Sequence, residues 1–406
     1  MASAINTNVN SLNAQRNLGM SAGSLATSMQ RLSSGLRVNS AKDDAAGLAI
    51  AERFLTQSKG LTVGARNSND GISLAQTAEG ALGKVGDMLQ RMRELAVQSG
   101  NATNSKSDRA SLQAEVKQLT DEIDRVAKQT GFNNQKILDG SFAGAVFQVG
   151  ANAGDNITVG ALTNSTAKGL ADVSYAFSQA ASDVNATAVS TLTAITEPTT
   201  LSISITGGSN VTLGEIKAAS SGEERMGQIV EAINRKSADT GVTAFLSKND
   251  SGTYRIDLMS SKLDSAGDAT VITTVGFTVA TTGLLGAALA SNINATNTTT
   301  DALGIDTLTV DTQRNAWVAL KKIDAAIDQV NSARANLGAL QSRFESAVGN
   351  IEISVENIAA SRGRIVDADF AKETANLSRT QILQQAGTAM VAQANQLPQG
   401  VLALLR

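Results

Sequence analysis

The chain has 406 residues, of which 42% are hydrophobic and 17% charged, with a formal net charge of −3. It contains no His and no Cys, which excludes imidazole bases, thiol nucleophiles, disulfides and metal sites built from these residues. The slightly acidic balance gives no field that attracts nucleic acid, and no uninterrupted apolar stretch is long enough to span a membrane. We therefore expect no catalytic residue, no cofactor, no bound metal and no enzymatic activity.

The first zone, from Met1 to about Asp139, follows a helical pattern. Its apolar residues alternate spacings of four and three, which keeps one seam toward a partner helix as in a coiled coil. The seam residues are Leu18, Ala22, Leu25, Met29, Leu32, then Leu74, Ala78, Ala81, Val85, Met88, Met92, Leu95, and then Leu112, Val116, Leu119, Ile123, Val126. Ser107 and Asp108 are the predicted N-cap of the third helix, and Gly131 its predicted stop.

The middle of the chain changes to β patterning. A small hairpin is predicted from residues 142–149 and 156–159. Within the Thr-, Ser- and Gly-rich region 150–300, alternating apolar residues predict strands at 201–205 and 254–258. Turn signals lie at 207–210 and 249–252, and one short amphipathic helix is predicted over 226–233. These elements indicate a separate, exposed α+β insert.

The C-terminal zone returns to one long helical register. Apolar residues keep the same spacing from Leu320 to Ile365, which predicts one helix of some 45 residues, about 70 Å long. We expect this helix to close an antiparallel bundle with the N-terminal helices. The predicted fold class is therefore mainly α: a long helical coiled-coil bundle formed by the N- and C-terminal regions, with a small β-hairpin and an α+β insert.

The two ends of the chain lack charge. Residues 1–30 contain only Arg16, and residues 380–405 contain no charged side chain. A solvated surface helix normally carries charges on its outer face, so these ends are typical of assembly segments. We expect the C-terminal segment to be disordered in the single chain and to order against other copies or the other terminus; a floppy tail is the alternative.

Several stretches resemble bacterial flagellin. They are the opening Ala4–Val9 through Leu12, residues 30–51 (QRLSSGLRVNSAKDDAAGLAIA), 89–98 (LQRMRELAVQ), 121–126 (DEIDRV), 368–370 (ADF), 373–395 (ETANLSRTQILQQAGTAMVAQAN) and the terminal LLR. Residues 201–260 also resemble an insertion motif of that family. The resemblance covers both terminal zones.

The resemblance implies three domains and a mechanical function. Residues 1–45 and 366–406 would form the inner tube of a filament, 46–165 and 300–365 the coiled-coil bundle, and 166–299 the exposed insert. The subunit would be exported unfolded through a type III channel and polymerise outside the cell for swimming motility. The expected assembly residues are Ile5, Val9, Leu12, Leu18, Leu25, Met29, Leu32, Leu383, Met390, Leu397, Val401 and Leu404.

The resemblance also implies partners. They are further flagellin copies, hook-filament junction and cap proteins, an export chaperone, an animal Toll-like receptor and a plant leucine-rich-repeat receptor kinase. Arg91, Leu95 and Glu115 match the Toll-like receptor contacts, although the pattern alone indicates two surface charges and a seam leucine. Residues 30–51 match the plant-sensed segment, with Leu36 where Ser is usual and Ala49 where Gln is common.

Two other motifs have a structural and a chemical interpretation. The adjacent carboxylates Asp43 and Asp44 follow Ser40, and we interpret Ser40-x-x-Asp43 as a helix start rather than an acid–base pair. Gly80, Gly83 and Gly86 superficially resemble a phosphate loop, but the spacing is wrong, so we interpret them as sites of close helix packing.

Three other function classes have their own sequence requirements. A junction protein shares the terminal design but does not grow long polymers. The zinc protease found in some flagellins needs a His-Glu-x-x-His motif, which a chain without His cannot supply. An adhesin would need a binding pocket in the insert, for which the sequence gives no aromatic cluster.

Overall fold

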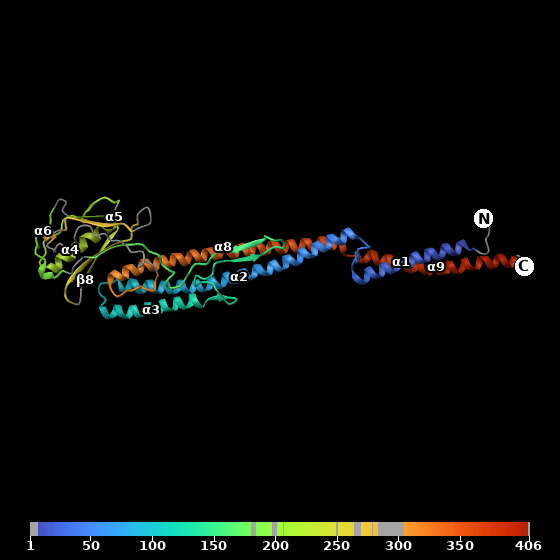
Figure 1. The fold of residues 1–406 in the computed structure, drawn as a ribbon, viewed down its shortest axis with the longest axis horizontal. Helices are drawn as coiled ribbons and strands as arrows, with labels where there is room; N and C mark the ends of the chain where they lie inside the picture. Colours follow the sequence, from blue (N-terminus) through green and yellow to red (C-terminus); the bar gives the residue numbers. More distant parts are fainter. Residues whose placement is uncertain are drawn as a thin grey trace. The chain divides into compact units, whose positions relative to one another are not determined.

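A computed structural model describes residues 7–179, 184–196, 201–205, 207–248, 251–263, 269–277, 279–282 and 304–404 (Figure 1). The chain divides into two compact units, each described by itself. The first comprises Met1–Gly71, Val146–Ile157 and Arg343–Arg406, and the second Ile72–Ala145 and Thr158–Ser342.

Helices dominate, as the sequence predicts. The described helices are α1 (Val9–Ser34), α2 (Ala45–Ser99), α3 (Lys106–Gln129), α4 (Gly222–Arg235), α5 (Ser237–Thr240), α6 (Val279–Thr282), α8 (Gln313–Val366), α9 (Phe370–Leu404) and the 3-10 turn η1 (Ala186–Ala188). The predicted long C-terminal helix is confirmed as α8, which at 54 residues begins seven residues earlier than the apolar register. A mainly α fold with small antiparallel sheets is therefore confirmed.

The first unit contains an antiparallel pair of helices, α1 and α9. Asn8 and Ser11 near the start of α1 contact Ala394 and Asn395 of α9, whereas Arg31 near the end of α1 contacts Glu373. The C-terminal segment is thus an ordered helix packed on the other terminus. The prediction that it is disordered in the single chain is not met, because α1 supplies the partner that its apolar stripe lacks alone.

The first unit also holds the tip of a small hairpin against α2. Strand β3 (Ala145–Gln148) pairs with β4 (Asn156–Val159), as predicted. The ring of Phe147 packs edge-on against Phe344 of α8, with centroids 5.4 Å apart. The Asn67 side chain of α2 donates a 2.9 Å hydrogen bond to the Gln148 carbonyl. These contacts fix the hairpin tip on the helices.

The second unit contains the helical bundle. Leu74, Val85 and Leu95 of α2 are buried, as are Ile323, Val330 and Leu337 of α8, so the predicted seams do face the interior. Side-chain bonds set the direction: Glu79 accepts from Gln341, whereas Arg93, farther along α2, pairs with Asp324 at 2.7 Å. The two helices therefore run antiparallel.

The helix ends correct several sequence predictions. The N-cap of α3 is Ser105, not Ser107 or Asp108: its side chain accepts from the backbone N–H of Asp108, and the Asp108 carboxylate accepts from the Ser105 N–H. This reciprocal capping box places Asp108 in the third helical position. The helix ends at Gln129 with Thr130 as an extended C-cap, so Gly131 does not stop it and instead begins a strand.

A similar shift occurs at the start of α2. The carboxylate of Asp43 accepts from the N–H groups of Asn39 and Ser40 and from the Ser40 hydroxyl, which closes a turn before the helix. The helix begins at Ala45, and Asp44 caps it by accepting a 2.8 Å bond from the Gly47 N–H. The carboxylates are structural, but Asp44 and not Ser40 is the cap.

The insert lies within the second unit as an α+β structure. Strand β8 (Val242–Lys248) pairs antiparallel with β9 (Tyr254–Ser260), which also pairs with β5 (Ala176–Gln179). A second sheet has the order β10–β6–β7, formed by Ile272–Val275, Ser202–Ile205 and Val211–Thr212. Helix α4 contributes buried Met226, Ile229 and Ile233 to a core shared with these strands. A further short ladder joins β1 (Gly131–Phe132) and β2 (Gln135–Lys136).

The strands predicted at 201–205 and 254–258 and the amphipathic helix predicted over 226–233 are confirmed as β6, β9 and α4. In the turn after β6, Gly207 has a positive φ of 82°, which a residue without Cβ adopts freely. In the second turn signal, Asn249 and Asp250 lie outside the described residues, and Gly252 has a φ of 77°.

Candidate assembly surface on the terminal helices

Polar contacts at both ends hold α1 and α9 together. The Asn8 side chain accepts from the Ser11 N–H at 3.0 Å and donates to the Ala394 carbonyl at 2.7 Å, so it caps α1 and joins it to α9. The Ser11 hydroxyl donates to the Asn395 side-chain oxygen at 2.6 Å. At the other end, Arg31 pairs at 3.2 Å with Glu373, which is mostly buried. The pair is therefore fixed in register by hydrogen bonds rather than by a large apolar core.

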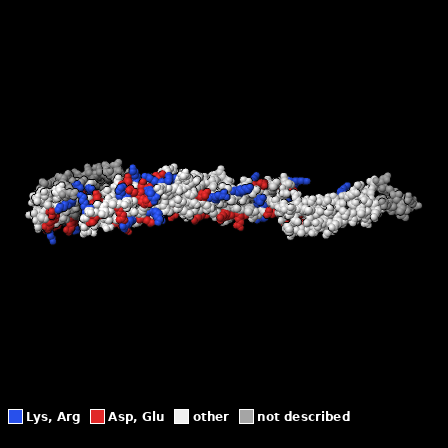
Figure 2. All heavy atoms as spheres, turned by 90° about the horizontal axis from the view of Figure 1, so that it is seen from below, with Lys and Arg blue, Asp and Glu red and all other residues white. Residues whose placement is uncertain are grey.

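The outer surface of this pair is mostly neutral and exposes several apolar side chains. In Figure 2, the helices α1 and α9 appear nearly free of coloured charged atoms, in contrast to the helices of the bundle. Among the predicted assembly residues, Val9 (66%), Leu12 (54%), Met29 (56%), Leu383 (49%) and Met390 (60%) are strongly exposed. An isolated exposed apolar residue is normal, but several on one uncharged surface mark an interaction site.

The other predicted assembly residues lie between the helices or outside the description. Leu18, Leu25 and Leu32 are half-buried, and Leu18 lines a groove together with residues of α9. Ile5 lies outside the described residues, and Leu397, Val401 and Leu404 are described only as part of the α9 backbone. The structure therefore brings Leu18, Leu383 and Met390 together.

These three residues line a groove of about 600 Å³ between α1 and α9. The groove is also lined by Asn10, Asn13, Asn17 and Gln393, which the sequence interpretation did not assign to the site. Asn10, Asn13 and Asn17 follow one another at spacings of three and four residues along α1, which is the signal that could have placed them on one face. Such amides can bond to another polypeptide without the desolvation penalty of a charge.

The predicted receptor contacts lie on α2 and α3 in the second unit. The Arg91 guanidinium pairs with Glu115 of α3 at 2.8 Å and with Glu94 at 2.9 Å. These hydrogen bonds, that to Glu115 foremost, raise the pKa of Arg91 above its ordinary value. Leu95, in contrast, is only 1% exposed, because it belongs to the buried seam. Arg91 and Glu115 thus form one surface feature, and Leu95 supports it from below.

Among the described residues, neither a metal-binding group nor a helix able to cross a membrane is present. In the part of the chain that the structure describes, no group of three or more carboxylates or other ligating side chains could hold a metal ion. No described helix combines the length and apolarity needed to cross a membrane.

Comparison with known proteins identifies the family. Residues 5–143 match the bacterial flagellin N-terminal helical region, residues 320–405 the C-terminal helical region, and residues 200–262 the flagellin hook IN motif. Flagellin C of Vibrio cholerae is 38% identical, and flagellin of Salmonella choleraesuis 37% identical, each over 100% of both chains. FliC from Burkholderia pseudomallei is a solved structure with 26% identity and a TM-score of 0.36, covering 67% of this chain and 99% of that one.

The family is structural rather than enzymatic, and its members build the flagellar filament outside the cell. The chain therefore belongs to the bacterial flagellin family and is a structural subunit of the flagellar filament.

Proposed function

We propose that this subunit polymerises through the outer surface and groove of the α1–α9 pair. Residues 1–45 and 366–406 would then form the assembly domain, residues 46–165 and 300–365 the bundle domain, and residues 166–299 the exposed insert. The observation that carries the proposal is the coincidence of exposed apolar side chains with two stretches nearly free of charge, residues 1–30, where Arg16 is the one charged residue, and residues 380–405. Burial of apolar surface contributes about 25 cal/mol per Å², and over residues 380–405 no charged side chain must be desolvated to gain it.

The groove supports a second copy as the occupant. Its lining combines apolar Leu18, Leu383 and Met390 with neutral amides, which is the composition of α1 and α9 themselves. A copy of the same helices therefore complements it chemically. The remaining predicted assembly positions, Ile5, Leu397, Val401 and Leu404, stay predictions from the sequence.

Seeded polymerisation tests the proposal. Depolymerised protein is mixed with sheared filament fragments in mildly precipitating salt and imaged by electron microscopy, beside a chain lacking residues 1–30 and 380–406. We expect long tubes from the full chain and none from the truncated one. Tubes from the truncated chain would contradict assembly through the ends.

A point substitution sharpens the test. Leu383→Glu places a carboxylate on the surface of α9, and Val275→Glu makes the same change at an insert residue of nearly equal exposure (49% and 46%). We expect Leu383→Glu to abolish tube growth while the chain stays helical, and Val275→Glu to leave growth unchanged. Equal growth of both variants, or equal loss, would mean that the α1–α9 surface is not the contact.

We also propose that the chain reaches the filament by export as an unfolded polypeptide through a type III channel, assisted by an export chaperone. The absence of Cys supports this, because no disulfide can lock the fold. Junction and cap proteins at the two ends of the filament would bind the same terminal helices. Appearance of the chain in the medium of cells that lack the channel would argue against this route.

We further propose recognition by an animal Toll-like receptor through Arg91 and Glu115, with Leu95 holding α2 in place beneath them. The exposed ion pair between Arg91 of α2 and Glu115 of α3 supports this proposal. Monomeric Arg91→Ala should lose receptor signalling in reporter cells. Arg125→Ala is the matched control, because Arg125 forms a comparable exposed pair with Glu122 on α3. Similar signalling by both variants would count against the contact.

Residues 30–51 are the candidate segment for a plant receptor kinase. They form the end of α1, the connection to α2 and its first residues, and much of this segment is exposed in the single chain. Leu36 makes an isolated bridge to Asp367. A synthetic peptide of residues 30–51 should elicit a weaker response than its Leu36→Ser variant; an equal response would show that Leu36 does not limit sensing.

A further inference from the structure

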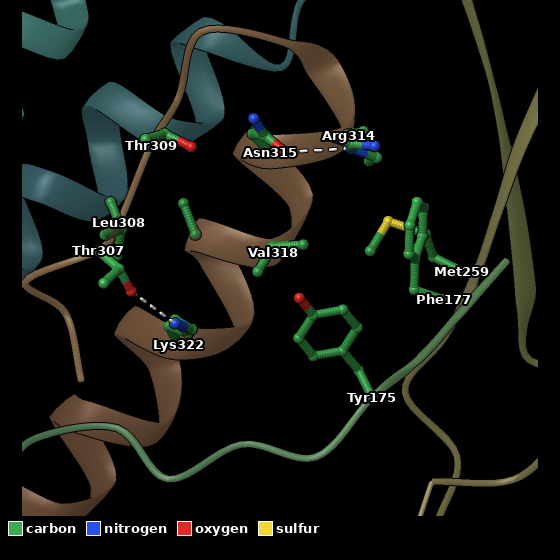
Figure 3. A pocket seen from close by; sticks show the side chains of 11 residues that line it. Tyr175, Phe177, Met259, Thr307, Leu308, Thr309, Arg314, Asn315, Val318 and Lys322 are labelled. Carbon is green, nitrogen blue, oxygen red and sulfur yellow. Dashed lines mark hydrogen bonds between the residues drawn. The ribbon is translucent and has the colours of Figure 1, made fainter. Parts of the chain in front are cut away.

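A cavity in the second unit has an aromatic and hydroxyl-rich lining. It measures about 420 Å³ and lies beside the first turns of α8. Figure 3 shows Tyr175 and Phe177 on one side and Asn315, Thr307 and Thr309 on the other. Flat apolar rings facing hydroxyl and amide groups suit a sugar ring, which has apolar faces and a polar edge.

This aromatic group is assembled only by the fold. Tyr175 and Phe177 lie near and in β5, and the Tyr175 ring packs edge-on against Trp317 of α8 with centroids 6.3 Å apart. One turn later on the same helix, Lys321 lies 5.8 Å from the Trp317 ring centroid. The sequence interpretation found no aromatic cluster because Tyr175 and Phe177 are far from Trp317 along the chain.

A second cavity, of about 630 Å³, carries positive charge. Its lining includes five cations and two carboxylates, namely Lys106, Arg109, Lys248, Arg255, Arg314, Asp257 and Asp311. Asp257 is 1% exposed and its oxygens face Arg255 at 3.2 Å and Arg314 at 3.8 Å. Because Asp257 is buried behind these groups, the accessible lining holds five cations against one exposed carboxylate, that of Asp311.

Arg314 borders both cavities. Its guanidinium lies 5.0 Å from the Phe177 ring centroid and donates a 3.1 Å hydrogen bond to Asn315. Together with Asp257, these contacts hold the guanidinium in one orientation at the boundary. A ligand that spans the boundary would meet an ordered cation between an aromatic and a basic region.

We propose that the two cavities flanking Arg314 bind an acidic oligosaccharide. One sugar ring lies in the aromatic cavity, and carboxylate groups of the neighbouring sugars lie in the basic cavity near Lys106 and Lys248. Each cavity is within the size range of ligand sites, about 300–1,000 Å³. Charge complementarity selects the acidic glycan over a neutral one.

Trp317 supplies the readout, since it is the only Trp in the chain. The full-length monomer is titrated at low ionic strength with tetragalacturonic acid, and Trp317 fluorescence is followed beside calorimetry. Maltotetraose is the neutral glycan control, and sodium sulfate is the simple anion control. We expect saturable binding of tetragalacturonic acid only.

The paired variant Lys106→Gln, Lys248→Gln removes two exposed cations of the basic cavity. Its affinity should fall about tenfold, the effect expected from the loss of two exposed charge contacts. The pair Lys84→Gln, Lys117→Gln removes the same charge elsewhere and should bind like the parent. The proposal is overturned if tetragalacturonic acid does not bind, or if both paired variants lose the same affinity for it. It is also overturned if maltotetraose or sulfate binds as tightly as tetragalacturonic acid.

Discussion

Replacing a glycine of α2 by alanine should stabilise the protein at some positions and destabilise it at others. Replacing a helix-interior Gly by Ala stabilises a helix by about 1 kcal/mol, because Gly loses more backbone entropy on folding. No described heavy atom lies within 4 Å of a Cβ added at Gly80, Gly83 or Gly86. The prediction that these three glycines allow close helix packing is therefore wrong within the chain. We expect Gly83→Ala to gain the full stabilisation of about 1 kcal/mol.

At Gly64 and Gly71 the added methyl group meets atoms that are held in place. A Cβ at Gly64 would lie 2.4 Å from the Val149 carbonyl oxygen, and one at Gly71 would lie 2.6 Å from the ring of buried Phe344. Forcing an extra methyl group into a packed site costs about 1–3 kcal/mol. This cost exceeds the gain in helix propensity, so the net change should be a destabilisation of up to about 2 kcal/mol.

Thermal unfolding of the monomer, followed by circular dichroism at 222 nm, checks the two signs. A change of 1 kcal/mol shifts Tm by about 2–4 °C for a domain of this size class. We expect Gly83→Ala to raise Tm and Gly64→Ala to lower it. A rise of equal size in both variants would refute the argument, because it would mean that Val149 does not approach α2 as closely as described.

Three further predictions concern helix ends and a buried cation. Ser105→Ala should destabilise α3 by about 1 kcal/mol, whereas Ser107→Ala should be near neutral in the same unfolding assay; the reverse order would contradict the capping box. Hydrogen bonds from Ser105 hold the pKa of Asp108 below its ordinary value of 3.8. The Asp108 carboxylate therefore contributes to stability above pH 3.8, and this contribution is lost as the pH falls through the folded-state pKa. In an acid titration of stability, Asp108→Asn should flatten that loss. Arg225, fully buried, donates to the carbonyls of loop residues before α4, so Arg225→Met should cost about 1–3 kcal/mol per unpaired carbonyl and speed proteolysis of the insert, while exposed Arg235→Met should not.

Sequence periodicity was sufficient for the elements whose partners are other helices. The seams of α2 and α8 need only a repeating spacing, and the burial of Val85, Leu95, Val330 and Leu337 follows directly from it. The register also predicted α8, although its first turns were missed because Trp317 packs against Tyr175 beside the insert and does not continue the seam pattern.

Features that depend on contacts between distant segments were not predictable. Nothing local distinguishes Gly64, which faces the hairpin tip, from Gly83, which faces no described atom. The same holds for Arg225, whose burial is decided by loops that the helix pattern does not specify. At the candidate assembly surface five of the predicted residues, Val9, Leu12, Met29, Leu383 and Met390, are exposed, while the amides of the groove required the register between α1 and α9 to be known.

The lack of ionisable side chains between Thr380 and Leu404 of α9 has a thermodynamic consequence. Association on such a surface is governed by the release of water from apolar groups and not by protons or counterions. Its strength should therefore change little between acidic and neutral media, decline in the cold, and increase in sulfate, which is excluded from protein surfaces. A filament joined in this way tolerates changes of acidity that would loosen one joined by salt bridges.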